Sequence, residues 1–117
     1  MGLFSKRLGE APVPGEATVV LPAGKVKIDY EERREGRELD GEWPGIPEGL
    51  EVSVRPTSGG DPLTVKPPRL DNEFASGGRI GSRYGHIEVA VAGEHVVTVP
   101  AFDPGRQTFE PHLAFKK

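Results

Sequence analysis

The run from Lys25 to Glu31 constrains the fold more than any other part of the sequence. Apolar side chains alternate there with charged ones. The apolar set is Val26, Ile28 and Tyr30, and the charged set is Lys25, Lys27, Asp29 and Glu31. Successive side chains of an extended strand point to opposite faces. The pattern therefore predicts a strand with one face on a core and the other in water, as in a half-solvated antiparallel sheet.

Other short segments have the same strand-like character and are separated by glycine and proline. They are residues 17–21, 50–55, 63–65, 87–92 and 95–101. A final strand and the closing aromatic side chains are expected from Phe102, Phe109, Leu113 and Phe115. Two stretches, 31–49 and 69–85, are polar or rich in glycine and are predicted to be irregular.

The segments 87–92 and 95–101 are predicted to form a hairpin. A bulged turn that contains Gly93 pairs Val91 with Val97 and Val89 with Val99. This register gathers four branched side chains on one face, which a two-residue loop does not.

A short internal similarity also bears on the fold. Residues 23–30 align without a gap with residues 92–99. Each segment has an Ala-Gly turn followed by a strand whose second, fourth and sixth residues point inward. The similarity is too short to indicate a duplicated repeat, but it predicts that His95 heads a core-facing row.

These patterns together define a fold class. Six to eight short strands with turn signals between them predict an all-β fold, a small antiparallel two-layer β-sandwich of immunoglobulin-like type. The 117 residues, with 16 glycines and 12 prolines, suffice for one such core. Residues 1–16 are predicted to be a flexible N-terminal tail, and residues 17–117 a single β-sandwich domain.

Several of these patterns resemble uncharacterised bacterial β-sandwich domains, especially those of actinobacterial type. The matching features are Ala23-Gly24, the strand from Leu50 to Pro56 with Gly59-Gly60 after it, and Ala92-Gly93. Together they cover about half of the chain. The resemblance implies an immunoglobulin-like fold and no activity. This chain has His95 where those domains commonly have tyrosine.

Charge and composition narrow the classes of partner. The chain carries 15 basic and 18 acidic side chains, a formal net charge of -3, so no strong positive field attracts nucleic acid or an acidic membrane. The N-terminal residues lack the apolar run of a secretory signal, and no stretch approaches a membrane span. We therefore expect a cytoplasmic protein without stable membrane insertion and without nucleic acid as a partner.

Catalytic and metal-binding patterns are weak. Ser82, His86 and Asp71 are near one another in the sequence, as a hydrolase triad would require, but no Gly-x-Ser-x-Gly motif is present. The three histidines fit no recognised zinc spacing, and the chain has no cysteine. We therefore assign no catalytic residue, no metal and no cofactor, and predict that the chain is not an enzyme.

Two regions are candidates for binding. The glycine-rich stretch 77–86 contains Arg79, Arg83 and Tyr84, which can grip a phosphate or an unstacked base; the alternative is a flexible loop whose arginines serve solubility. Trp43, beside two prolines, can act as a sugar-stacking platform, as part of a proline-rich contact surface, or as a lid over one end of the core.

These observations give two hypotheses for function. The first is a non-enzymatic β-sandwich module that binds or scaffolds another protein, because sandwiches commonly present loops or edges to partners. The alternative is a domain that binds a small ligand or carbohydrate through the Trp43 region or the Arg79-Arg83-Tyr84 loop.

Overall fold

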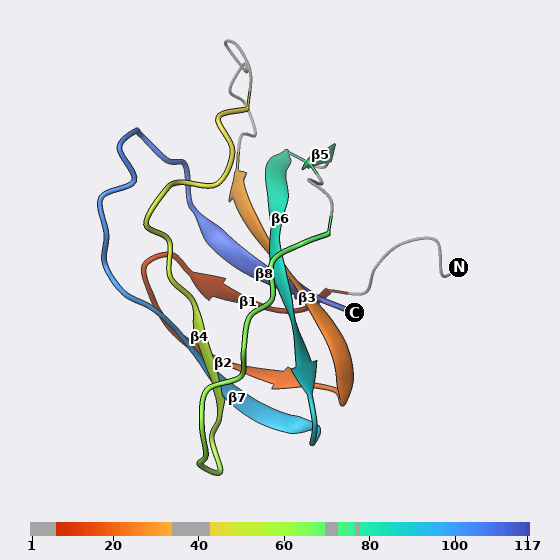
Figure 1. Ribbon diagram of the computed structural model, residues 1–117. Helices are drawn as coiled ribbons and strands as arrows, with labels where there is room; N and C mark the ends of the chain where they lie inside the picture. The colour runs from red at the N-terminus through yellow and green to blue at the C-terminus, as the bar shows by residue number, and fades with distance from the viewer. Residues whose placement is uncertain (1–6, 34–42, 70–72, 77) are drawn as a thin grey trace.

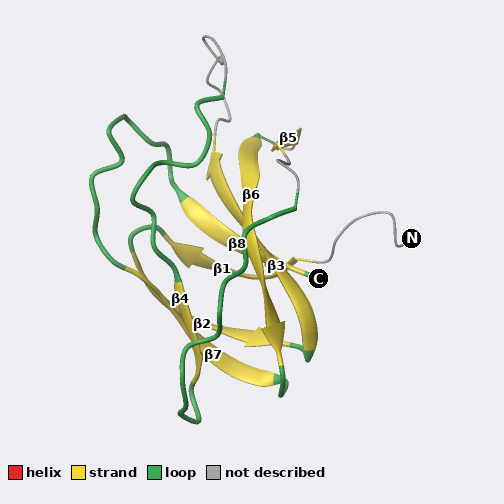
Figure 2. Ribbon diagram, viewed as in Figure 1, coloured by secondary structure: helices red, strands yellow, loops and turns green. Residues whose placement is uncertain are grey.

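The computed structural model describes residues 7–33, 43–69, 73–76 and 78–117, and the described part of the chain is all β (Figures 1 and 2). Its strands are β1 (Arg7–Pro12), β2 (Gly15–Leu21), β3 (Gly24–Arg33), β4 (Ser53–Pro56), β5 (Glu73–Ser76), β6 (Arg79–Val89), β7 (Gly93–Val99) and β8 (His112–Lys116). None of the described residues forms a helix of the length and apolarity that a membrane span requires.

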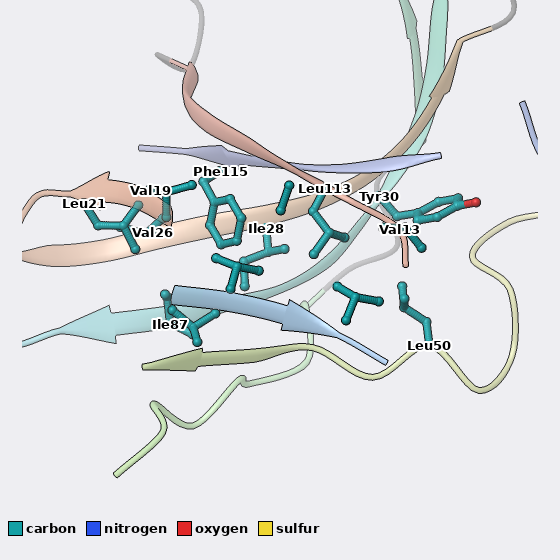
Figure 3. Close-up of a cluster of buried hydrophobic side chains, with 14 of the residues drawn as sticks. Val13, Val19, Leu21, Val26, Ile28, Tyr30, Leu50, Ile87, Leu113 and Phe115 are labelled. Atoms are coloured by element: carbon teal, nitrogen blue, oxygen red, sulfur yellow. The ribbon is translucent and has the colours of Figure 1, made fainter. Parts of the chain in front are cut away.

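The strands form two antiparallel sheets. One has five strands in the order β1-β8-β3-β6-β5, and the other has three in the order β2-β7-β4. Side chains from both sheets meet in one core (Figure 3). The prediction of an all-β fold with antiparallel strands is thus confirmed.

The inner face of β3 follows the sequence pattern. Val26, Ile28 and Tyr30 are all fully buried, and they point at the three-stranded sheet. Their packing partners include residues from both sheets: Val19, Leu21, Val54, Val97, Ile87, Leu113 and Phe115. His95 is also buried at the head of the row that continues with Val97 and Val99, as the internal similarity predicts.

The predicted hairpin does not form. β6 and β7 belong to different sheets: β6 pairs with β3, and β7 pairs with β2 and β4. The chain passes from one sheet to the other through Ala90–Ala92, and Val91 is 78 % exposed instead of facing Val97. A short turn between two strands suits a hairpin and a change of sheet equally well, and the choice depends on the distant strands β2 and β3.

The two Ala-Gly turns of the internal similarity have the same role. Gly24 follows the passage from β2 to β3, and Gly93 follows the passage from β6 to β7. Both glycines have positive φ angles, +109° and +151°, which residues with a side chain rarely adopt. Leu21 pairs with Gly93 and Gly24 pairs with Val89, so the two turns lie side by side. We call residues 20–24 together with 89–94 the corner end of the sandwich, at the bottom of Figure 1.

The N-terminal prediction was wrong beyond residue 6. Residues 7–16, predicted to be part of a flexible tail, form β1 and the beginning of β2. β1 pairs with β8, from Arg7 opposite Lys116 to Pro12 opposite His112. A partner so distant in sequence leaves no local signal. Residues 1–6 lie outside the described part.

Two predictions in the middle of the chain were also wrong. Residues 63–65 form no strand; Leu63 donates its backbone N–H to Val54, and an isolated bridge joins Lys66 to His86. Much of the stretch 69–85, predicted to be irregular, lies in β5 and β6. Its glycines misled the prediction, because two of them, Gly81 and Gly85, serve the close approach of neighbouring chain segments inside the sheet.

Paired substitutions test the change of sheet. Val89 is 3 % exposed and Val91 is 78 % exposed. We expect Val89→Ala to lower the free energy of unfolding by about 2 kcal/mol, because it removes two buried methyl groups. Val91→Ala is expected to change it by less than about 0.5 kcal/mol. Urea unfolding of both variants measures this, and a hairpin with Val91 on the core would make the two losses similar.

Candidate functional site

The three binding candidates on residues 77–86 lie on a strand, β6, and not on a loop. Arg83 donates from Nε to Asp29 on β3. Tyr84 lies at a bulge and donates its hydroxyl to the backbone oxygen of Leu50, 3.3 Å away. Burial, and next the charge of Glu51, raise the pKa of Tyr84. Arg79 lies four residues before Arg83 on the same strand. The structure therefore does not bring the three side chains to one point.

Trp43 packs against the core at the end of the sandwich opposite the corner end. Its indole ring stacks on Tyr30 with centroids 6.3 Å apart, and the guanidinium of Arg106 lies 5.4 Å from the ring centre. Its Nε1 donates to Ser82 Oγ at 2.7 Å. These contacts are those that the lid interpretation predicts. A hollow beside it is lined by Pro44, Ile46, Pro47, Glu48 and residues 103–106, and not by Trp43 itself.

A fully buried carboxylate, Glu32, shares Tyr30 and Arg106 with Trp43 as contacts. Tyr30 donates its hydroxyl to it at 2.9 Å, and Arg106 pairs with it at 2.7 Å. The backbone N–H of Phe109 also donates to it, at 3.3 Å. Burial, and next the neighbouring charge of Glu32, raise the pKa of Tyr30 above its ordinary value, so this hydroxyl remains a donor.

The outer face of β3 contradicts the sequence-based expectation most clearly. Asp29 and Glu31 were predicted to lie in water, yet they are 2 % and 0 % exposed. Burying an unpaired carboxylate is costly, so each requires cationic partners. The neighbouring strands of the five-stranded sheet supply them.

Glu31 has cationic partners from two strands. Arg7 of β1 donates to both carboxylate oxygens at 3.1 Å. From β8, His112 Nε2 lies 2.9 Å from Oε1, and Lys116 Nζ lies 3.0 Å from Oε2. Lys116 also donates to Asp29 at 2.9 Å, so one ammonium group joins the two carboxylates. We call Arg7, Asp29, Glu31, Arg83, His112 and Lys116 the charged layer.

An aromatic side chain covers part of this layer. Phe74 of β5 lies opposite Gly81, and a Cβ atom at residue 81 would lie 2.8 Å from its ring and 2.3 Å from the backbone oxygen of Tyr30. Glycine at this position therefore leaves the space that the ring occupies. The ring reaches Lys116, whose Nζ is 4.4 Å from its centre, a favourable cation–π distance.

The hydrogen bonds of His112 define its charge. Nδ1 faces the backbone oxygen of Glu110, and Nε2 faces the carboxylate of Glu31, both at 2.9 Å. Both atoms are acceptors, so both ring nitrogens must donate and the ring is a cation. Burial alone would lower the pKa of His112, but the hydrogen bond to Glu31 and the one to the Glu110 carbonyl outweigh it and raise that pKa.

The same contacts act in the opposite direction on the acid. Burial alone would raise the pKa of Glu31, but the hydrogen bonds from His112 and Lys116 and the charges of Lys116 and Arg7 lower it to about 2. Each carboxylate of the layer is thus paired with two or more cations. In the described part of the chain, no three side chains of histidine, aspartate or glutamate converge as metal ligands.

Two of the hydrolase candidates point to opposite faces of the five-stranded sheet. Ser82 pairs with core-facing Tyr30, and His86 pairs with outward-facing Lys27; the bulge at Tyr84 lies between them. Asp71 lies outside the described residues.

The sequence did contain a signal for the charged layer. His112, Ala114 and Lys116 alternate with buried Leu113 and Phe115, as acids alternate with apolar residues on β3. A basic outward row of one strand and an acidic outward row of another indicate neighbouring strands.

Comparisons with known proteins add nothing to this geometry: no family model, curated protein or solved structure matches the chain.

Removal of one carboxylate tests the layer. Glu31→Gln leaves Arg7, His112 and Lys116 short of their common partner, and we expect a loss of about 3–5 kcal/mol in unfolding free energy. Glu88→Gln is the matched control, because Glu88 is exposed on β6 and is expected to contribute less than about 0.5 kcal/mol. Urea unfolding at pH 7 measures both, and equal losses would contradict a structural role for the layer.

The raised pKa of His112 makes stability depend on pH. Above pH 6.5 the unfolded chain loses a proton that folded His112 keeps, so its contribution is complete below pH 6.5 and is lost as pH rises through the folded pKa. We expect the unfolding free energy to fall between pH 6 and 9, and His112→Gln to reduce that fall. His86→Gln, on the same face, should leave it intact. Urea unfolding across this range measures the slopes, and equal slopes for wild type and His112→Gln would refute the assignment.

Proposed function

We propose that this chain is a non-enzymatic, immunoglobulin-like β-sandwich module that binds another protein, and that the corner end is the contacting surface. The observation that carries the proposal is the exposure of two large apolar side chains there. Val20 is 65 % exposed and Val91 is 78 % exposed. Apolar groups gathered on a folded surface commonly mark an interaction site.

The surface around these valines is hollowed on both sides of residues 92–93. One hollow, of about 500 Å³, is lined by Leu8, Val20, Leu21, Pro22, Ala92, Gly93 and Lys117. The other, of similar volume, is lined by residues 56–59, Leu63 and residues 90–95. Val20 lines the first hollow and Val91 lines the second, so a partner can place its own apolar side chains in the hollows while it covers Val20 and Val91.

The corner end is also held in place before any partner binds. Seven residue pairs join β2 to β7, and Gly24 is paired with Val89 at the adjoining turn. Little conformational freedom remains to be lost on binding, which favours affinity. Complete burial of one valine contributes about 1.5 kcal/mol or more.

The buried acids Asp29 and Glu31 are engaged in ion pairs within the fold, which supports a binding role over a catalytic one. Asp29 and Glu31 are buried under Arg7, Arg83 and Lys116, where a substrate in solution does not reach them. For the alternative, a carbohydrate at Trp43, support is weaker, because the indole N–H and ring already contact Ser82, Tyr30 and Arg106.

A photocrosslinking experiment tests the proposal. A photoreactive amino acid replaces Val91 in the full chain, which is irradiated in the cells that produce it. The matched position is Thr64, which is exposed and lines neither hollow. We expect a discrete protein adduct from residue 91 and none from residue 64.

A second substitution makes the test specific for the corner end. Val20→Glu is expected to reduce the adduct about tenfold, the equivalent of about 1.5 kcal/mol of lost burial. Thr18→Glu, on the same face of β2 but outside both hollows, should leave the yield unchanged. No adduct at residue 91, equal adducts at residue 64, or insensitivity to Val20→Glu would each overturn the proposal.

A further inference from the structure

Two arginines lie directly opposite each other at the end of the five-stranded sheet away from the corner end. Arg33 is the last residue of β3, Arg79 is the first of β6, and the two are paired in the antiparallel register. Paired residues of adjacent strands point to the same face. Both side chains therefore lie on the outer face, beyond the charged layer.

This arginine pair differs from the cations of the charged layer. Arg7, Arg83 and Lys116 each have a carboxylate partner. Within the described ranges, neither Arg33 nor Arg79 has an ion pair or a side-chain hydrogen bond. Arg79 Nε is moreover buried and is without an acceptor.

The arrangement is unfavourable as it stands. Like charges directly opposite each other on a sheet repel. A buried donor without an acceptor costs roughly 1–3 kcal/mol, and such groups are rare in native proteins. An anion between the two guanidinium groups would remove both costs, because it supplies acceptor oxygens and compensating charge.

We propose that Arg33 and Arg79 form a binding site for a phosphate monoester or free phosphate. A guanidinium group presents its donors in a planar fork that fits phosphate oxygens. A phosphate monoester carries close to two negative charges near neutral pH, which match two arginines. A carboxylate or a phosphodiester carries one and leaves one cation uncompensated.

The site does not depend on the proposed function at the corner end. β3 runs for ten residues from Gly24 to Arg33, and its nine steps of about 3.3 Å span about 30 Å. No residue is shared between the two surfaces, so the failure of one proposal would leave the other unaffected.

An NMR titration tests the site. The arginine Nε–Hε signals of the full chain are followed at pH 7.5 and constant ionic strength, with separate additions of inorganic phosphate, phosphoserine and dimethyl phosphate. We expect a saturable shift of the Arg79 signal with one or both dianions and at least fivefold weaker binding of dimethyl phosphate. Stronger binding of phosphoserine than of phosphate identifies a monoester as the ligand, and the reverse order identifies free phosphate.

Charge-neutral variants complete the test. Arg33→Gln and Arg79→Gln are each expected to weaken binding at least fivefold. The control is Arg55→Gln, an exposed arginine of β4 on the other sheet, which should bind as wild type does. A shift that grows linearly with concentration, or one that either variant leaves intact, would overturn the proposal.

The melting temperature provides an independent test of the phosphate site. Without phosphate, Arg79→Gln is expected to keep or raise the melting temperature, because it removes the repulsion. A lower melting temperature would mean that Arg79 supports the fold, and would overturn the proposal. Phosphate should raise the melting temperature of wild type and not that of Arg79→Gln.

Discussion

The buried carboxylates of β3 are the constraint on which the rest of the structure depends. β3 is the central strand, paired with β6 on one side and β8 on the other. Asp29 and Glu31 lie on its outer face, where their burial requires Arg83 from β6, Lys116 from β8 and, through Glu31, Arg7 from β1. The carboxylates thus tie β1, β8 and β6 to β3 by charge, in addition to the backbone hydrogen bonds.

This arrangement fixes the register of the sheet more tightly than an apolar pattern alone. A slip of β3 by one residue would turn Asp29 and Glu31 into the core and Val26 and Ile28 out of it. It would also leave Lys116 without either of its carboxylate partners. Burying an unpaired charge is costly, so the packing on both faces of the strand disfavours any other register. Gly81 extends the same logic to β5, because its lack of a side chain admits the ring of Phe74.

The sequence was sufficient for the core-facing row of β3 and insufficient for the row on its outer face. Period-two alternation predicted the core-facing row of β3 and the burial of His95, because an apolar row on a strand is stable only when it is buried in the core. A charged row can instead face water or be buried against side chains of opposite charge. Here the basic side chains of β8 lie more than 80 residues away in the sequence, so no local pattern reveals them. The short turn before Gly93 was also ambiguous, because it suits a hairpin and a change of sheet equally well. Among the binding candidates, Arg83 and Tyr84 proved to have partners that no local pattern indicates.

The same charges also determine which surfaces remain for partners. Arg7, Arg83 and Lys116 are each held in an ion pair with Asp29 or Glu31, so their donors are already engaged in the middle of the outer face. Among the described residues, the two surfaces proposed for partners lie at the two ends of β3: the valines of the corner end at one, and the arginine pair at the other. One end is apolar and the other cationic, so they suit different chemistry. Since about 30 Å of strand separates them, only an extended partner can contact both, and a small ligand is confined to one.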